Sequence, residues 1–439
     1  MSRRHGAGRA LRPARQRRRP LAGAAAVAGL MVAGLAAVPG APADAATFTV
    51  CALGCPYTQI QPAVDAARAG GIVRVGPGRF AGGIVIAKAL TLSGAGAGAT
   101  VIAGGGPVVS VSGGPVIIGG VTVTGGNTSG DGAGILSTGT LTVEDSTIRH
   151  NAAGGDGGGI ASDDGSVLIT GSSVSKNTAA FEGGGIASTG PSSTGMTLMS
   201  DTVTANSAGD SGGGIEVADR ATATLSGTSV DANTAASCGG GVDVVGAALA
   251  MTSGQVDDNQ AQDCGGGIEI GGFRYGPAGS GTITDTSINS NAAGTGGGLD
   301  IGGRTSLTMT DDAVSANAAT MAGGGINVYS GLRLNDTSVT RNTSGGDGGG
   351  ISNVGGDPVL TGDSVDANTA AGKGGGLFNG FSLVRNHRVA GTTTLNPDTS
   401  VNSNRAAAGG GIDVLAGSVK LNGATVARNL PDNCQPASC

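Results

Sequence analysis

The feature that most constrains this fold is a triple glycine that recurs along the chain. Ten Gly-Gly-Gly triplets are followed by Ile, Leu or Val, and a degenerate eleventh copy of this motif spans residues 132–135. Between the glycines the aliphatic residues also recur, which indicates a repeat fold rather than a disordered glycine-rich segment. The residues directly after the triplets are Ile160, Ile186, Ile215, Val242, Ile268, Leu299, Ile326, Ile351, Leu377 and Ile412.

An asparagine precedes each triplet by five or six residues, and a Val or Ile lies three residues before each asparagine. In residues 140–143 and 215–217, apolar and polar residues alternate with a period of two, as in a β-strand. Triple glycines exclude a helix, so each unit of 25–35 residues is predicted to contain two or three short strands. The asparagines are expected to stack as a ladder at one turn, and glycine supplies positive φ at the next. The asparagines are Asn151, Asn177, Asn206, Asn233, Asn259, Asn291, Asn317, Asn342, Asn368 and Asn404.

A single unit cannot bury its apolar side alone, so the units must stack at about 4.8 Å per coil. We therefore predict an all-β, single-domain, right-handed parallel β-helix of about eleven coils over residues 76–429. Residues 47–75 are predicted to form an N-terminal helical cap, with a capping box at residues 58–61 and Ile60, Ala63, Val64 and Ala67 on one face of the helix. Residues 430–439 are the expected C-terminal cap segment.

Residues 1–46 have the order of a secretory signal peptide. Eight arginines lie between Arg3 and Arg19, an apolar stretch follows, and Ala43-Asp44-Ala45 is a small-x-small cleavage signal. A membrane anchor fits this stretch less well, and both general secretion and a twin-arginine route remain open. The sequence predicts a secreted protein, extracellular or at the cell surface, that does not span a membrane once the signal is removed.

The chain that remains is acidic and contains all six cysteines. Its 17 Lys and Arg against 30 Asp and Glu give a net charge near −13, which argues against a nucleic-acid partner. Disulfides are expected in an exported protein. The predicted pairs are Cys51–Cys55, Cys238–Cys264 and Cys434–Cys439; Cys238 and Cys264 occupy the same position one coil apart.

Residues 57–105, from Tyr-Thr-Gln-Ile-Gln-Pro-Ala-Val to Ala-Leu-Thr-Leu-Ser-Gly-Ala-Gly, resemble the start of pectin-lyase-like β-helix proteins. The Gly-Gly-Gly-Ile repeats over residues 132–429 are similar to those of polymorphic outer-membrane-type repeat proteins. The first resemblance implies a superfamily that contains pectate lyases, polygalacturonases, pectinesterases, epimerases and adhesins. None of the catalytic signatures of those enzyme families is present, so no residue role is transferred from them.

A column of carboxylates is the main candidate for chemistry. The middle residue of the strand after each triplet is expected to point outward, and in four consecutive coils it is acidic. Carboxylates about 5 Å apart suit a Ca²⁺ site or a pair of catalytic acids, and a solvated acidic stripe is the structural alternative. The predicted metal ligands are Glu216, Asp243, Glu269 and Asp300.

Aromatic residues, scarce in this chain, gather after the later triplets together with arginines. Such side chains suit binding of a sugar or uronate, although packing of inserted loops explains them equally well. The candidate ligand-binding residues are Phe273, Arg274, Tyr275, Tyr329, Phe378 and Phe381.

Two functions are compatible with this sequence. The first is binding of a polysaccharide or cell-surface partner without catalysis. The second is a polysaccharide lyase or glycoside hydrolase that acts on an acidic polysaccharide. A lyase would hold Ca²⁺ on Asp243, Glu269 and Asp300, with Arg274 or Arg304 as base, and a hydrolase would use two of the carboxylates.

Overall fold

A computed structural model describes residues 46–191, 195–271, 277–384 and 387–436. The chain divides into two units, Met1–Asp44 and Ala45–Cys439, and every described element belongs to the second. The predicted signal peptide lies outside the described residues, except for Ala46. Among the described residues, no helix has the length and apolarity needed to cross a membrane.

One coil illustrates the repeat. It passes through β23 (Ile215–Ala218), β24 (Thr222–Ser226), β25 (Ser229–Asp231) and β26 (Thr234–Ala235) before the next triplet begins the following coil. These strands belong to four parallel sheets, which we name C, A, B and D in that order. Each strand pairs with its equivalent in the next coil, for example β23 with β27 (Val242–Val245).

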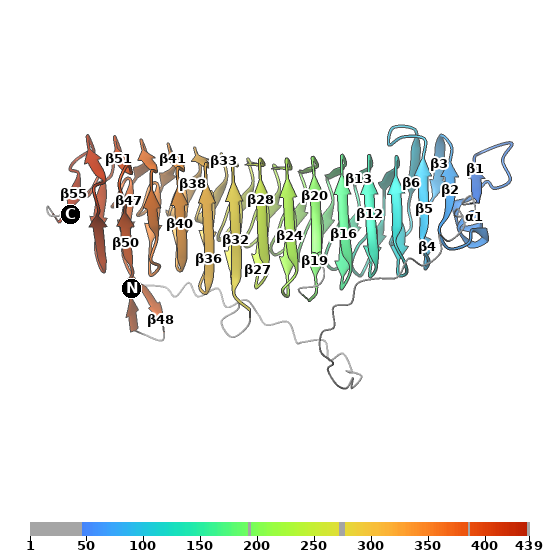
Figure 1. Cartoon of the computed structure of the whole chain (residues 1–439), viewed down its shortest axis with the longest axis horizontal. Coiled ribbons are helices and arrows are strands. Elements are labelled where there is room, and N and C mark those ends of the chain that lie inside the picture. Colours follow the sequence, from blue (N-terminus) through green and yellow to red (C-terminus); the bar gives the residue numbers. More distant parts are fainter. Residues whose placement is uncertain (1–45, 192–194, 272–276, 385–386, 437–439) are drawn as a thin grey trace, which may run out of the picture. The chain divides into compact units, whose positions relative to one another are not determined.

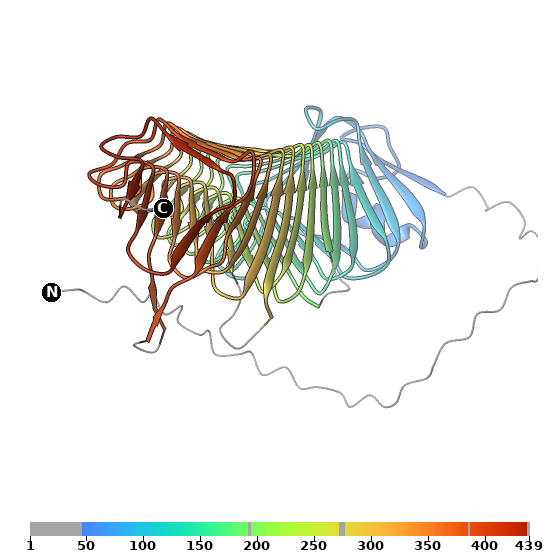
Figure 2. The same cartoon turned by 60° about the vertical axis from the view of Figure 1, so that its left-hand side comes forward.

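The coils lie side by side along one axis, as Figures 1 and 2 show. The predicted parallel β-helix is therefore confirmed. Within the described residues sheet A has 15 strands, which corresponds to about fifteen coils rather than eleven. The lower number was wrong because it counted triplets followed by Ile, Leu or Val. The coils formed by residues 47–131 contain none of these, since their one triplet, Gly104–Gly106, is followed by Pro107.

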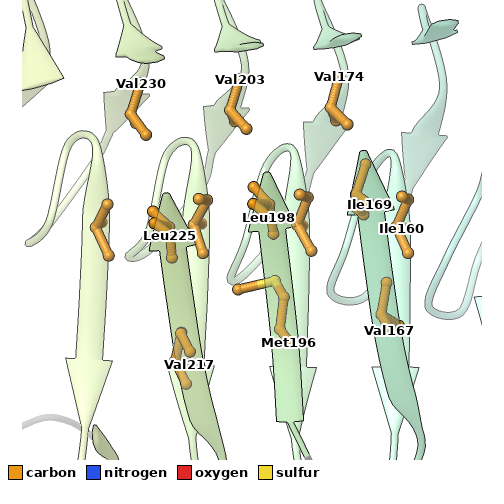
Figure 3. Close-up of a cluster of buried hydrophobic side chains, with 14 of the residues drawn as sticks. Ile160, Val167, Ile169, Val174, Met196, Leu198, Val203, Val217, Leu225 and Val230 are labelled. Carbon is orange, nitrogen blue, oxygen red and sulfur yellow. The ribbon is translucent and has the colours of Figure 1, made fainter. Parts of the chain in front are cut away.

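The core is a set of aliphatic rows that run through the stack. Val174, Val203 and Val230 lie side by side in successive coils of sheet B, and each is fully buried (Figure 3). Leu198 and Leu225 form a similar row on sheet A. Because every coil places the same residue type at the same position, apolar side chains contact their equivalents above and below, as the repeat pattern predicts.

The asparagine ladder joins the B-to-D turns. The side-chain amide of Asn177 donates to Asn206 Oδ1 at 3.0 Å and to the carbonyl oxygen of Ile148 at 3.0 Å. The backbone N–H of Asn177 also donates to Asn206 Oδ1, at 2.9 Å. Each amide thus satisfies polar groups in two neighbouring coils, as expected of a stacked asparagine.

At the N-terminal end, α1 (Ile60–Ala66) packs its buried face on the first coils. Ile60, Ala63 and Val64, predicted to lie on one face of the helix, are buried, and so is Ala67, which is its C-cap. The predicted capping box is wrong, since Gln59 is the N-cap and its side chain makes no capping hydrogen bond. The Gln61 side chain instead bonds to the backbone of Val85, which ties the helix to β4 (Ile84–Ile86).

Candidate functional site

Parallel pairing on sheet C places the four predicted metal ligands in one row. Glu216 on β23 pairs with Asp243 on β27, which pairs with Glu269 on β31 (Ile268–Gly271). Glu269 pairs in turn with Asp300 on β35 (Leu299–Ile301). We call Glu216, Asp243, Glu269 and Asp300 the carboxylate row. Paired positions of neighbouring parallel strands are about 5 Å apart along the stack.

The row is buried, which corrects the expectation of a solvated stripe. Glu216 is 1% exposed, Asp243 0% and Asp300 4%, while Glu269 is half-buried. The residues on either side of each carboxylate belong to the aliphatic core, so the carboxylates do point away from it. They are covered because the D-to-C turn lies against this face of sheet C.

Contacts across the D-to-C turn identify what covers the row. The Thr295 hydroxyl, just before the triplet of its coil, donates to Asp300 Oδ2 at 2.7 Å. In the preceding coil Cys264 Sγ lies 3.1 Å from Glu269 Oε2. Gly239 has φ of 62°, and a Cβ there would lie 2.5 Å from the Cβ of Asp243. Glycine at the first position of the triplet is therefore required both by the turn and by this close approach.

The contact between the D-to-C turn and the carboxylate row is also reflected in a sequence pattern that was not used to predict it. In the ten coils with a triplet, the residue before the triplet and the middle residue of the following strand are never both acidic. Asp156 and Glu182 oppose Ala161 and Ala187, whereas Asp300 opposes Thr295. This is the pattern expected of two positions in contact, because facing buried carboxylates repel each other.

Burial has electrostatic consequences at the far end of the row. It raises the pKa of Asp300, although hydrogen bonds from Asn327 and Thr295 oppose that rise. Asn327 occupies the same position on the next strand, β39 (Ile326–Val328), and its Nδ2 donates to Asp300 Oδ2 at 3.0 Å. Asn327 is 1% exposed, and its Oδ1 is a buried acceptor with no hydrogen-bond partner among the described residues.

These oxygens fit a hard cation. Ca²⁺ takes carboxylate and amide oxygens as ligands, and a dication offsets the mutual repulsion of stacked carboxylates. Because Ca–O bonds are about 2.4 Å long, one ion would bridge only adjacent members of the row, or Asp300 and the Asn327 Oδ1 beside it. Among the described residues, the group of three acidic, Cys or His ligand atoms within 4.8 Å of one another is Cys238, Cys264 and Glu269, so Ca²⁺ binding by all four carboxylates stays a prediction.

The row reaches an accessible surface at Tyr329. This residue follows β39 at the C-to-A corner, where coils pass from sheet C to sheet A, and it is 41% exposed. Burial of part of the side chain raises the pKa of Tyr329, and the negative charge of Asp300 raises it further. A hydrogen bond with the Asn327 side chain opposes this rise. The phenol therefore connects the solvent to the buried Asp300 through Asn327.

A hairpin extends the same corner two coils further. Strands β48 (Ser382–Val384) and β49 (His387–Val389) pair antiparallel and project from the stack (Figures 1 and 2). At its base the guanidinium of Arg388 lies 4.4 Å from the ring centre of Phe381, which is half-buried. A Cβ on Gly355, in the intervening coil, would lie 3.0 Å from Ser382 Oγ, so the hairpin base contacts the coil between Phe381 and Tyr329.

The other candidate residues are distributed as follows. Phe378 is only 5% exposed, so little of its ring is available to a ligand. Arg304 is exposed at the C-to-A corner of the Asp300 coil. Phe273, Arg274 and Tyr275 lie outside the described residues. Of the catalytic candidates, Asp243 and Asp300 are too buried to touch a polymer directly.

Two of the predicted disulfides are present in the structure. Cys51 is bonded to Cys55, and Cys238 to Cys264 across adjacent coils with a Cα–Cα distance of 4.6 Å. The Cys434–Cys439 pair falls partly outside the described residues.

Comparison with known proteins agrees with this architecture. Residues 83–252 match the family described as right handed beta helix region. The chain is a right-handed parallel β-helix protein. A search of curated protein sequences finds no significant match.

Solved structures show a likeness of fold to this β-helix. The A-module of the mannuronan C-5 epimerase AlgE4 from Azotobacter vinelandii is 16% identical, with 86% of this chain and 92% of that chain covered and a TM-score of 0.46. The pectin methylesterase PemA from Erwinia chrysanthemi is 11% identical, with 60% and 87% covered and a TM-score of 0.34. The pectate lyase Pel9A is 11% identical, with 87% and 79% covered and a TM-score of 0.31. Similarity at this level does not indicate an activity.

Proposed function

We propose that this β-helix is an exported protein that binds an acidic polysaccharide along the C-to-A corner. The observation that carries the proposal is the alignment of Tyr329 and the Phe381–Arg388 pair on that corner, two coils apart, in a chain with nine Phe and Tyr and no Trp. Two coils correspond to about 10 Å, a span that suits successive sugars of an extended chain.

The side chains at this corner match the chemistry of a uronate polymer. Exposed aromatic rings offer apolar faces to sugar rings, and arginines bind carboxylates through charge-assisted hydrogen bonds. Arg304 and Arg388 are exposed there, although the mature chain is acidic overall. Ca²⁺ held by the carboxylate row would reduce the repulsion between this acidic protein and an anionic polymer.

Catalysis on the same polysaccharide is the second candidate, and the Tyr329–Asn327–Asp300 arrangement favours it. The raised pKa of Tyr329 keeps its phenol protonated at neutral pH, and the phenol lies at the exposed corner where a proton donor would meet the polymer. A lyase or glycoside hydrolase needs such a group within reach of the glycosidic oxygen.

Two substitutions at one residue separate binding from catalysis. The mature protein would be titrated calorimetrically with polygalacturonate, alginate and neutral dextran, with and without Ca²⁺, and product formation would be followed as new double bonds and reducing ends. Tyr329→Ala is expected to weaken uronate binding about tenfold, because truncation of an aromatic anchor costs more than about 1 kcal/mol and about 1.4 kcal/mol corresponds to a factor of ten. Tyr329→Phe retains the ring and is expected to bind normally.

The outcomes discriminate between the candidates. Turnover by the wild type that Tyr329→Phe abolishes, with binding retained, identifies the enzyme. Thr282→Ala on the outer face of sheet A is the control for a surface change elsewhere. Equal affinity of the wild type and Tyr329→Ala for both uronate polymers would refute the proposed surface.

A further inference from the structure

The disulfide Cys238–Cys264 lies against a carboxylate of the row. The two cysteines form a parallel bridge one coil apart, and Cys264 Sγ is 3.1 Å from Glu269 Oε2. Both sulfur atoms and one Glu269 oxygen lie within 4.8 Å of one another. Cys238 is buried, whereas Cys264 and Glu269 are half-buried, so the group is accessible from one side.

We propose that Cys238, Cys264 and Glu269 form a binding site for a thiophilic dication such as Zn²⁺ when this disulfide is reduced. A dithiol reductant supplies two electrons in two thiol–disulfide exchanges: its own sulfurs form a disulfide, and both cysteines become thiols. The metal then binds two thiolates and one carboxylate, and the two thiol protons pass to solvent. The inference is independent of polysaccharide binding.

The spacing of the coils suits this ligand set. Zn–S bonds are about 2.3 Å long, so two thiolates on one tetrahedral Zn²⁺ lie roughly 3.8 Å apart. The Cα atoms of Cys238 and Cys264 are 4.6 Å apart, and parallel stacking directs both side chains to the same side. A water completes the coordination, since the group has three protein ligands among the described residues.

The backbone at this position does not depend on the disulfide. The N–H of Gly239 donates to the Cys264 carbonyl at 2.9 Å, and the N–H of Gly212 donates to the Cys238 carbonyl at 3.0 Å. These bonds continue the regular ladder of the D-to-C turns, so reduction is expected to leave both cysteines in place. Disulfide and metal are mutually exclusive states of the same two sulfurs.

The neighbouring charges favour a dication over free thiolates. Asp243 and Asp300 adjoin Glu269 in the carboxylate row, and their negative field opposes the formation of two further anions. A bound dication compensates for the thiolates and for Glu269 together. Two sulfur ligands select a softer metal than the oxygen donors at the Asp300 end.

Cobalt absorption tests the site, because thiolate ligands give Co²⁺ a strong near-ultraviolet charge-transfer band. The mature protein would be reduced with a dithiol, desalted without oxygen and titrated with Co²⁺. One equivalent is expected to produce the band, Zn²⁺ is expected to displace it, and the oxidised protein is expected to show none. Cys264→Ser should abolish the band, whereas Cys51→Ser, which breaks a different disulfide, should retain it.

Glu269→Gln keeps both cysteines and covers the case in which Cys264→Ser does not fold. In the reduced state it is expected to bind Co²⁺ at least about tenfold more weakly while retaining the thiolate band. Far-ultraviolet circular dichroism verifies that the reduced protein is folded. A folded, reduced wild type without the band, an equal band in folded Cys264→Ser, unchanged affinity in Glu269→Gln, or unfolding on reduction would each overturn the proposal.

Discussion

Asn206 donates both its backbone N–H and its side-chain Nδ2 to a single acceptor, Oδ1 of Asn233 in the next coil, at 2.9 and 3.0 Å. Asn233 repeats the arrangement toward Asn259 and also donates to the carbonyl oxygen of Val203 at 2.9 Å. All three amides are buried. The ladder is therefore a continuous line of satisfied polar groups whose members each serve two coils.

Removal of one amide from the ladder should be costly. Asn233→Ala removes the acceptor of the Asn206 backbone N–H and Nδ2 and the donor to the Val203 carbonyl, and buried unsatisfied groups destabilise by about 1–3 kcal/mol each. We expect a loss of roughly 3–5 kcal/mol, measured by denaturant unfolding. Asn422→Ala, at an exposed position, is the control and should change stability by less than about 0.5 kcal/mol. A similar effect of both substitutions would contradict this role.

Much of this architecture could be predicted from spacing alone. The interval from each asparagine to its triplet specifies one turn, and the Val or Ile three residues before it specifies a buried row, as Val203 and Val230 illustrate. The first coils were undercounted because their buried residues, such as Ile102 and Val123, are not part of the repeat of asparagine, triple glycine and aliphatic residue. The spacing of a repeated motif predicts only the coils that contain the motif, so coils without it cannot be counted from the sequence in this way.

The burial of the carboxylate row could not be predicted in this way. Alternation correctly directs Asp243 away from the core, but whether that face meets solvent depends on where the D-to-C turn passes. The turn approaches because Gly239 has no side chain, and that approach is a tertiary contact. The link from Tyr329 through Asn327 to Asp300 also joins two coils, so no local motif identifies it.

The second glycine of a triplet tests how tightly the turns pack. A Cβ on Gly213 would lie 2.4 Å from the carbonyl oxygens of Gly240 and Thr234, and neither backbone oxygen can rotate away. Gly213→Ala is expected to destabilise the fold by about 3 kcal/mol or more through overpacking, measured as a lower denaturant midpoint. Gly98→Ala is the matched control, since a Cβ there meets nothing within 4 Å. Equal midpoints for the two variants would show that the turns can relax.

Three aspartates in the A-to-B turns predict a pH-dependent stability. Asp363 accepts backbone hydrogen bonds from Thr337 and Thr361, yet burial raises its pKa to about 7, and the charge of Asp336 adds to the rise. The pKa values of Asp201 and Asp312 are raised to about 6 for the same main reason. The folded protein therefore retains protons that the unfolded chain, with an ordinary aspartate pKa of 3.8, has already lost.

The sign follows from proton linkage. Between about pH 4 and pH 7 the folded state binds more protons than the unfolded state, so the free energy of unfolding falls as the pH rises. The melting temperature should be higher at pH 5 than at pH 8. Asp363→Thr introduces the residue found at this position in the neighbouring coils, Thr337 and Thr399. It should reduce the pH-dependent loss in the free energy of unfolding by at least about 1 kcal/mol. An unaltered pH profile in Asp363→Thr would assign the dependence to other groups.

Asp243 provides a test of the proposed cation that requires no knowledge of the polysaccharide. It lies between Glu216 and Glu269 in the buried row, and unit charges about 5 Å apart repel by roughly 3 kcal/mol at an effective dielectric constant of 20. In a chelator, Asp243→Asn should therefore raise the melting temperature, because it removes one of these charges at nearly constant volume. With Ca²⁺ added, the wild type should gain more stability than the variant, because ligand binding to the folded state stabilises it. Asp398→Asn, at an exposed turn, makes the same change in net charge and should alter neither result. If Ca²⁺ stabilises wild type and Asp243→Asn equally, the row does not hold the ion.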